Sequence, residues 1–572
     1  FVSVYIPWNY HEPQKGKENW NKEYSVKNFL DLCKKLGLYV IIKPGPFINA
    51  EWDCGGYPHW VLYSIEESKV RRLNKEYLDL VKYWYKKVIK IIKPYFITNA
   101  GNIILLQIEN EYDHLMELSG IYIPDDEAYE YLLEHYKIVK ELGVDIPIIT
   151  NEAKLIRGKT EIIDTRTYYP DIPWLWKWNF QYFDKKIEDA QKQQPDKPLF
   201  IMELQAGWFT QFDFPEYDIP KQLIVNILKN VLSQGASLLN IFLFTGGTTF
   251  PYWGCRGDIY GPQIPGHGST TSYDFMAPIR EWGEINEKKY YDIRAIGLFI
   301  KSFPQLIYDT QIVNNQDVRF LKCTENIKVI SKDRVYDDTN FETFNKKVLL
   351  LQRSNQKEGF LFLRNLDDEE KNVVVSYISP STNKKSYLPI KGELKLPAYS
   401  CFILPIDVYI PYTKTKIVYS TSELLTYKKL ADNVILVLYG LKGEKGEVLL
   451  EGKFKKYEVI VGEIKKDFVD EKLYLSYTHN GLKIAKLDNL VIIILDDSLA
   501  GRVYLDKNCL VISDVYFLRN ITSEEKSINL EVESKISKNS LFYIFSEKSV
   551  KKIFVDAKQK KFKLNKKISF AE

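Results

Sequence analysis

Short apolar runs alternate with segments of helical period over the first 305 or so residues of the chain. The apolar runs are rich in Val, Ile and Leu, and amphipathic stretches such as 74–92 separate them. This alternation is typical of strand–helix units in which each helix crosses over between two parallel strands. It restricts this part of the chain to an α/β architecture. We expect strands at 2–8, 39–43, 103–108, 146–150, 162–167, 199–202 and 239–244.

Seven such strands fit a (β/α)8 TIM barrel that lacks its first strand. The chain begins at Phe1, already inside an apolar run and without an initiator Met. We therefore expect an N-terminally truncated catalytic barrel over 1–305 that contains strands two to eight. Helices are predicted at about 25–36, 74–92, 128–142, 221–234 and 287–302.

The pattern changes after residue 305 to short alternating runs with turn signals, which predict all-β sandwich domains. We expect a small all-β domain over 306–405, a linker at 406–411 and a second β-sandwich over 406–572, whose C-terminal end is left open. Within the first of these, 359–364 and 373–377 are predicted to form a hairpin around the polar turn 365–370.

Composition excludes several classes of protein. The formal charge of +4 is nearly balanced, so no nucleic-acid partner is expected. The sequence contains no run of eighteen or more apolar residues, so no membrane-spanning helix is expected. The six cysteines are scattered without a CxxC pair, so neither a zinc site nor another metal or cofactor is expected. A homo-oligomer is left open. A cytoplasmic location is favoured, with a signal peptide upstream of Phe1 left open.

Carboxylates end two of the predicted strands. Glu109, Asn110 and Glu111 follow the apolar run 103–108, and Glu203 follows the run 199–202. Active sites of such barrels lie at the carboxyl ends of the strands. A pair of carboxyl groups at that position is what the hydrolysis of a glycosidic bond requires. Side chains alternate along a strand, so Glu109 is expected one layer deeper than Glu111, which favours Glu111 as the proton donor.

Six motifs occur in an order that resembles glycoside hydrolase family 35 β-galactosidases. They are 5–13, 43–62, the box from Glu109 to Tyr112, Glu203 with Gly207 and Trp208, 246–250, and 271–274. The resemblance implies a retaining exo-β-glycosidase that removes terminal β-D-galactosyl residues through a covalent glycosyl-enzyme intermediate. The substrate is then a β-galactoside, and the two carboxyl groups are expected about 5–5.5 Å apart.

The resemblance also implies roles for single residues. Glu111 is expected to be the general acid/base and Glu203 the nucleophile. Asn110 matches an amide that bonds the sugar 2-hydroxyl. The remaining substrate-binding positions implied by the family are Tyr5, Ala50, Glu51, Tyr252 and Tyr273.

Two alternatives remain. An exo-β-D-glucosaminidase of the same family uses the same chemistry, although the neutral amide of Asn110 suits a hydroxyl better than an amine. A catalytically decayed, truncated barrel that only binds carbohydrate is the other, and the presence of both Glu111 and Glu203 argues against it.

Overall fold

The computed structural model describes residues 1–113, 122–172, 178–211, 216–249, 253–254, 269–323, 348–524, 527–534, 540–547, 552–555, 558–560, 564–565 and 570–571. These residues form two compact units. The first comprises 1–219 and 236–286, and the second comprises 220–235 and 287–572.

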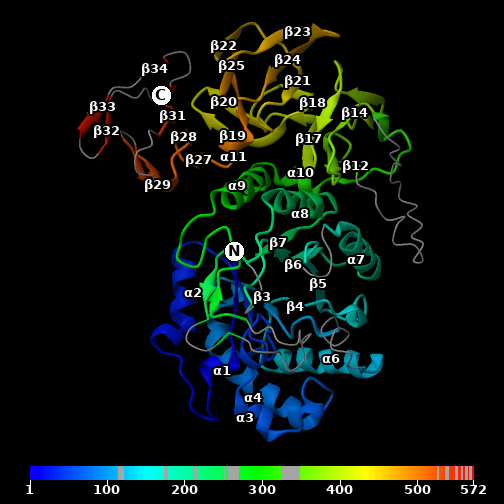
Figure 1. Cartoon of the computed structure of the whole chain (residues 1–572), viewed down its shortest axis with the longest axis vertical. Coiled ribbons are helices and arrows are strands. Elements are labelled where there is room, and N and C mark those ends of the chain that lie inside the picture. The colour runs from blue at the N-terminus through cyan, green and yellow to red at the C-terminus, as the bar shows by residue number, and fades with distance from the viewer. Residues whose placement is uncertain are drawn as a thin grey trace. The chain divides into compact units, whose positions relative to one another are not determined.

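The first unit is built on seven parallel strands that neighbour one another in chain order. Figure 1 labels β3 to β7 among them. The seven strands form a nearly closed barrel of the TIM type, as the sequence predicted. The outer strands β1 and β7 are linked by side chains, since Asn240 Nδ2 donates to Ser3 Oγ at 3.0 Å. The strands are β1 (Val2–Tyr5), β2 (Val40–Lys43), β3 (Ile103–Gln107), β4 (Ile148–Asn151), β5 (Ile163–Tyr168), β6 (Phe200–Gln205) and β7 (Leu238–Phe242).

Apolar residues on both faces explain why these strands form the centre of the unit. Ile41 of β2, Leu105 of β3, Ile149 of β4 and Met202 of β6 pack together in one buried cluster. Residues of the opposite face, such as Ile42, pack in a larger cluster with the helices. Strands buried on both faces are typical of parallel sheets covered by helices.

Side-chain caps mark the start of helices α2, α4 and α7 of this unit. Helix α4 (Lys75–Ile92) begins after Asn74, whose side chain accepts hydrogen bonds from the backbone N–H groups of Glu76 and Tyr77. Its buried residues recur at helical spacing and join the large cluster. The other helices are α1 (Trp8–His11), α2 (Val26–Lys35), α3 (His59–Ser64), α6 (Asp125–Glu141) and α7 (Phe180–Gln193), and β8 (Gly247–Thr248) pairs with β9 (Ser272–Tyr273).

The strand positions confirm the predicted barrel pattern, but the predicted set of helices was incomplete. Helix α7 was not predicted, although Phe180, Phe183 and Ile187 give it an apolar face. The helices predicted at 221–234 and 287–302 are present as α8 (Lys221–Ser233) and α9 (Glu287–Ser302). Both group with the second unit.

The second unit is dominated by antiparallel strands, which confirms the predicted β-rich half. An eight-stranded sheet has the order β10 (Gln311–Ile312), β12 (Val348–Ser354), β13 (Gly359–Asn365), β17 (Ser400–Tyr409), β18 (Lys416–Ser420), β21 (Lys445–Glu451), β24 (Lys472–Thr478) and β23 (Lys465–Val469). A second sheet contains β11 (Arg319–Cys323), β14 (Lys371–Ile378), β15 (Lys385–Leu388) and β16 (Leu394–Leu396).

Further sheets follow toward the C-terminus. One has the order β19 (Glu423–Leu430), β20 (Asn433–Gly440), β26 (Leu490–Asp496), β25 (Lys483–Leu487) and β22 (Tyr457–Val461). Another has the order β27 (Val503–Asp506), β28 (Cys509–Ser513), β31 (Phe542–Ser546), β35 (Phe570–Ala571) and β34 (Leu564–Asn565). The remaining elements are the pairs β29 (Phe517–Ser523) with β30 (Ile528–Glu533) and β32 (Ile553–Val555) with β33 (Lys558–Lys560), and the helices α10 (Pro304–Tyr308) and α11 (Asp497–Ala500).

The predicted hairpin of 359–364 with 373–377 is wrong. Strand β13 pairs with β12 and β17, whereas β14 pairs with β11, β15 and β16. Leu361 and Leu363 of β13 instead share a buried cluster with Val373 and Val375 of β14. Burial on both faces of β13 therefore placed the two strands in different sheets that pack on each other.

The predicted linker at 406–411 is also wrong for most of its length, because β17 runs through it from Ser400 to Tyr409. Ile406 and Val408 are buried and pair with β18. Their apolar pattern continues the strand as far as Tyr409, two residues before Pro411. The domain limits 306–405 and 406–572 stay a prediction.

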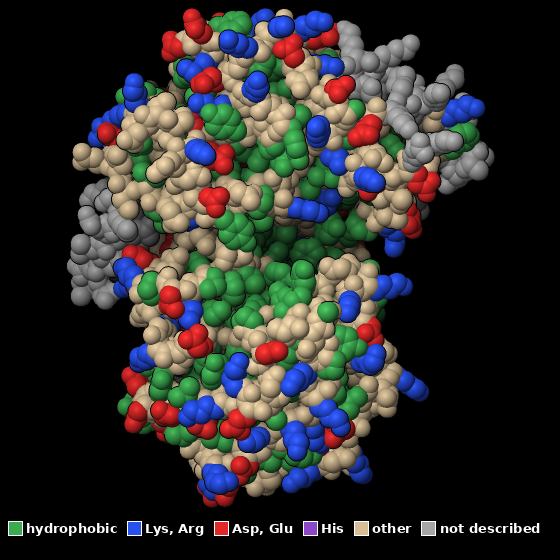
Figure 2. Space-filling model, turned by 180° about the vertical axis from the view of Figure 1, so that it is seen from behind, with side chains coloured by type: hydrophobic (Ala, Val, Ile, Leu, Met, Phe, Trp, Pro, Cys, Tyr) green, Lys and Arg blue, Asp and Glu red, His purple; other side chains and the backbone are tan. Residues whose placement is uncertain are grey.

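The surface mixes charges of both signs. On the face seen in Figure 2, Lys and Arg side chains are interspersed with Asp and Glu. Among the helices that the structure describes, none combines the length and apolarity that crossing a bilayer requires.

Candidate active site

The site lies at the carboxyl ends of neighbouring barrel strands. Glu203 is near the end of β6, Asn151 ends β4, Tyr169 follows β5, and Glu111 lies in the turn after β3. Parallel strands bring their carboxyl ends to one rim. The barrel order therefore gathers polar residues that are far apart in sequence.

Glu203 is held by hydroxyl and amide donors. Tyr169 Oη donates to its Oε2 at 2.9 Å, and Tyr5 Oη donates to its Oε1 at 3.4 Å. Asn151 Nδ2 donates to Oε1 at 3.4 Å, and Lys43 Nζ lies 3.9 Å from the same oxygen. Donors on both oxygens stabilise the ionised carboxylate. The structure thus brings the predicted residues Tyr5 and Glu203 together.

The Glu109 carboxylate accepts hydrogen bonds from two buried side chains. The Arg71 guanidinium donates to Glu109 Oε2 at 2.8 Å and to Oε1 at 3.3 Å. Tyr131 Oη donates to Oε1 at 2.5 Å. Both side chains of the ion pair are fully buried. The deeper placement predicted for Glu109 fits these contacts, which tie its carboxylate to the protein.

A network of amides fixes the orientation of Asn110 and Asn151. Gln107 Nε2 donates to the backbone carbonyl of Glu109 at 3.0 Å, so its nitrogen end faces the turn. The same nitrogen donates to Asn110 Oδ1 at 3.2 Å and to Asn151 Oδ1 at 3.1 Å. The Glu111 backbone N–H donates to Asn151 Oδ1 at 2.9 Å. The Nδ2 group of Asn151 therefore points toward the Glu203 carboxylate, and that of Asn110 toward Glu111 Oε2 at 3.5 Å.

Burial sets the protonation of Glu111. Its residue is 8% exposed, and its backbone adopts a positive φ of 46° in the turn after β3. Burial, followed by the carboxylates of Glu203 and Glu152, raises the pKa of Glu111 well above its ordinary value, and Lys186 opposes this rise. The arrangement favours a protonated Glu111.

Glu203 differs from Glu111 because neighbouring groups counteract the effect of burial on its pKa. Burial raises the pKa of Glu203, but the Lys43 charge and the hydroxyls of Tyr169 and Tyr5 lower it. Two coupled carboxyls titrate as a pair, and the donors gather on Glu203 rather than on Glu111. The geometry therefore favours a pair of carboxyl groups that holds a single proton, with that proton on Glu111.

A buried charge cluster lies beside the pair. Glu152, next to Asn151, pairs with Arg166 at 3.1 Å and with Lys186 of α7 at 3.0 Å. Thr167 donates its backbone N–H to Glu152 Oε1 at 2.9 Å. Two cations and a backbone donor thus hold the Glu152 carboxylate, which contributes to the raised pKa of Glu111.

Glu51 and Tyr273 lie together at another part of the rim. Tyr273 Oη donates to Glu51 Oε2. Asn49, Ala50 and Glu51 all have positive φ angles between 47° and 56°, so a tight turn presents the Glu51 carboxylate. Ala50 contributes its backbone to this turn. The predicted residue Tyr252 lies outside the described residues.

Sequence reasoning missed Lys43, Arg71, Asn151, Glu152 and Tyr169. Asn151 and Glu152 follow the apolar run 146–150, which is the same strand-end signal that identified Glu111 and Glu203. Tyr169 directly follows β5 and packs edge-on against Trp208, with ring centroids 6.1 Å apart. Arg71 lies between helices, and no periodic signal marks it.

Comparisons with known proteins agree with this architecture. The sequence profile of the glycosyl hydrolases family 35 matches residues 1–299, and that of β-galactosidase domain 2 matches residues 329–502. The chain is 34% identical over 300 residues to a β-galactosidase of Felis catus, covering 52% of this chain and 41% of that protein. It is 27% identical over 476 residues to the probable β-galactosidase A of Emericella nidulans, covering 79% and 43%.

The chain thus spans well under two thirds of the length of these relatives. A solved β-galactosidase from Rahnella sp. R3 covers 71% of this chain and 93% of its own at 11% identity, with a TM-score of 0.41. The family profile, however, matches more than half of the chain, and this chain therefore belongs to the glycosyl hydrolases family 35.

Proposed function

We propose that the chain carries the catalytic site of a retaining exo-β-galactosidase. One observation carries the proposal: Asn151 bonds both the backbone of Glu111 and the carboxylate of Glu203, so two buried carboxyl groups with opposed environments share one amide. A protonated carboxyl beside an ionised one is the arrangement that retaining hydrolysis requires. The β-galactosidases among the relatives support galactose as the sugar.

In the first step Glu203 attacks the anomeric carbon of the sugar. A bond forms between a Glu203 oxygen and C1 while the bond from C1 to the leaving oxygen breaks. The proton of Glu111 passes to that leaving oxygen. Lys43, Tyr5 and Tyr169 hold Glu203 ionised and oriented before the attack.

In the second step water attacks C1 and the Glu203–sugar bond breaks. Glu111, now ionised, takes one proton from the water, so both carboxyl groups return to their starting states. The raised pKa of Glu111 favours this recovery of the proton.

The orientation of Asn110 bears on the choice of sugar. Its Oδ1 accepts bonds from Gln107 and Asn151, which leaves Nδ2 as the group that faces Glu111. An N–H donor bonds a hydroxyl oxygen well, whereas an ammonium group offers donors only. This supports a neutral sugar at that position and disfavours the glucosaminidase alternative.

Rates on an aryl β-D-galactoside and an aryl β-D-glucosaminide test the proposal, with Glu203→Ala as control. We expect the galactoside to be cleaved faster, with β-galactose as the first product by NMR and turnover lost in the variant. Faster cleavage of the glucosaminide would show that the substrate sugar is glucosamine and not galactose. Turnover that survives in Glu203→Ala would contradict the proposal. An unmodified protein that turns over neither substrate would also contradict it and would favour the decayed barrel.

A further inference from the structure

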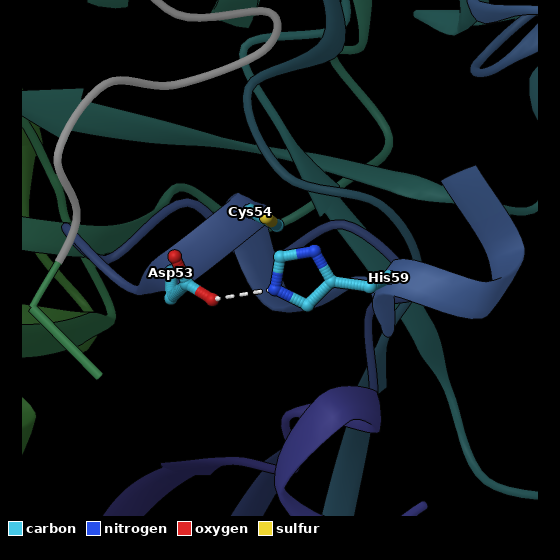
Figure 3. Close-up of side chains that lie close together, drawn as sticks. All are labelled: Asp53, Cys54 and His59. Carbon is cyan, nitrogen blue, oxygen red and sulfur yellow. Dashed lines mark ion pairs between the residues drawn. The ribbon is translucent and has the colours of Figure 1, made fainter. Parts of the chain in front are cut away.

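Three different metal-ligand types meet outside the catalytic pair. Asp53, Cys54 and His59 offer a carboxylate oxygen, a thiol sulfur and an imidazole nitrogen that all lie within 4.8 Å of one another. Figure 3 shows the Asp53 carboxylate and the His59 ring pointing toward each other, with Cys54 beside them on the same turn. Their chemistry suits a borderline-soft divalent cation such as Zn²⁺.

The spacing fits a tetrahedral ion. Ligand bonds of about 2.0–2.3 Å at tetrahedral angles place the ligand atoms about 3.3–3.6 Å apart. Asp53 Oδ2 and His59 Nε2 are 3.6 Å apart. The other separations stay below 4.8 Å. All three separations therefore lie within about 1.5 Å of the values for a tetrahedral ion.

The turn that carries two of the ligands is braced. Asn9 Nδ2 donates to the carbonyl of Asp53, and the Asp53 N–H donates to the carbonyl of Trp253, both at 2.9 Å. Gly55 follows with a φ of +58°, and a Cβ there would lie 2.2 Å from the Phe47 ring. The turn is therefore specified by close packing, which limits the conformational cost of binding an ion.

The third ligand comes from a separate element and keeps the site open to solvent. His59 is the first residue of α3, directly after Pro58. Its side chain is 64% exposed, and that of Asp53 is 30% exposed. Three protein ligands with solvent access leave a fourth position for water. An ion there would join the turn next to Glu51 to the start of α3.

We propose that Asp53, Cys54 and His59 form a solvent-open Zn²⁺ site that ties this turn to α3. The site is distinct from Glu111 and Glu203, and it makes no use of the galactosidase assignment. It stabilises the turn that follows Glu51 and takes no part in bond cleavage.

Metal titration of the chelator-treated full chain tests the proposal. Zn²⁺ is titrated in competition with a chromophoric chelator, and Co²⁺ serves as a spectroscopic probe for thiolate coordination. We expect one Zn²⁺ per chain whose affinity falls at least about tenfold in His59→Ala and in Asp53→Asn. The Co²⁺ form should show a thiolate charge-transfer band that Cys54→Ser removes.

Asp31→Asn is the matched control, because Asp31 also belongs to a surface ion pair, with Lys27 at 2.8 Å. It should bind Zn²⁺ as the unmodified chain does. His59 is exposed, so His59→Ala is expected to fold, and circular dichroism checks this. Equal affinity in the unmodified chain and His59→Ala, or a Co²⁺ form without a thiolate band, would overturn the proposal.

Discussion

The side-chain amide of Asn151 donates to Glu203 Oε1 at 3.4 Å. The same residue accepts a bond from the Glu111 backbone at 2.9 Å. One residue at the end of β4 therefore links the Glu203 carboxylate to the turn that carries Glu111.

Asn151→Ala should lower kcat by about 10- to 100-fold, because a hydrogen bond to a charged group is worth about 1.5–3 kcal/mol. The loss of a donor also raises the pKa of Glu203, so the acidic limb of the pH–rate profile should move to higher pH. Steady-state kinetics across pH measure both effects. A fall in kcat with an unmoved acidic limb would contradict the assigned contact.

The basic limb of the pH–rate profile reports on the pKa of Glu111. The charges of Glu203, Glu152, Lys186 and Glu51 all act on that pKa. Lys186 lowers the pKa of Glu111. Lys186→Met should therefore raise that pKa, keep Glu111 protonated to higher pH and move the basic limb upward. The pH dependence of kcat/KM tests this, with Lys192→Met of the same helix as control, since Lys192 pairs with Glu188 on the surface. A downward or absent shift would reject the role of Lys186.

The sequence predicted the strand-end carboxylates because apolar runs that end in acidic residues are visible without tertiary structure. In the structure Tyr5 contacts Glu203 and Tyr273 contacts Glu51, and the substrate-binding roles that the family resemblance implies for them stay a prediction. Asn151 and Tyr169 carry a similar strand-end signal, which was overlooked because neither is a carboxylate. Arg71 gives no such signal, since only the folded chain brings it 2.8 Å from Glu109.

Errors in the β half have a different cause. The spacing of strands β13 and β14 is short enough for a hairpin, but local sequence does not state which sheet a strand joins. That choice depends on burial of both faces of β13 against β12, β17 and the facing sheet. Long-range packing overrode the local turn signal.

The buried ion pair of Arg71 and Glu109 should matter for stability. Arg71→Met leaves the Glu109 carboxylate buried without its charge partner, which costs about 3–5 kcal/mol. Chemical denaturation followed by tryptophan fluorescence measures the change. Lys75→Met is the control, because the exposed Lys75–Asp79 pair contributes at most about 1 kcal/mol. Equal effects of the two substitutions would show that the buried pair is dispensable.

Substrates with different leaving groups separate Glu111 from Glu109. Glu111→Ala should lower kcat/KM by about 10²–10⁴-fold on a galactoside with a poor leaving group, because general acid catalysis has that size. A dinitrophenyl galactoside, whose leaving group needs no proton, should lose much less. If Glu109→Gln showed this leaving-group dependence and Glu111→Ala did not, the proton donor would be misassigned.

The central claim is that Glu203 attacks the anomeric carbon. A 2-deoxy-2-fluoro-β-D-galactosyl fluoride slows hydrolysis of the intermediate and leaves the sugar bound to the nucleophile. Peptide mapping by mass spectrometry then identifies the labelled residue. The label is predicted on Glu203, at one per chain. A label on Glu111 or Glu109, or turnover of galactosides without any trapped sugar, would contradict the mechanism.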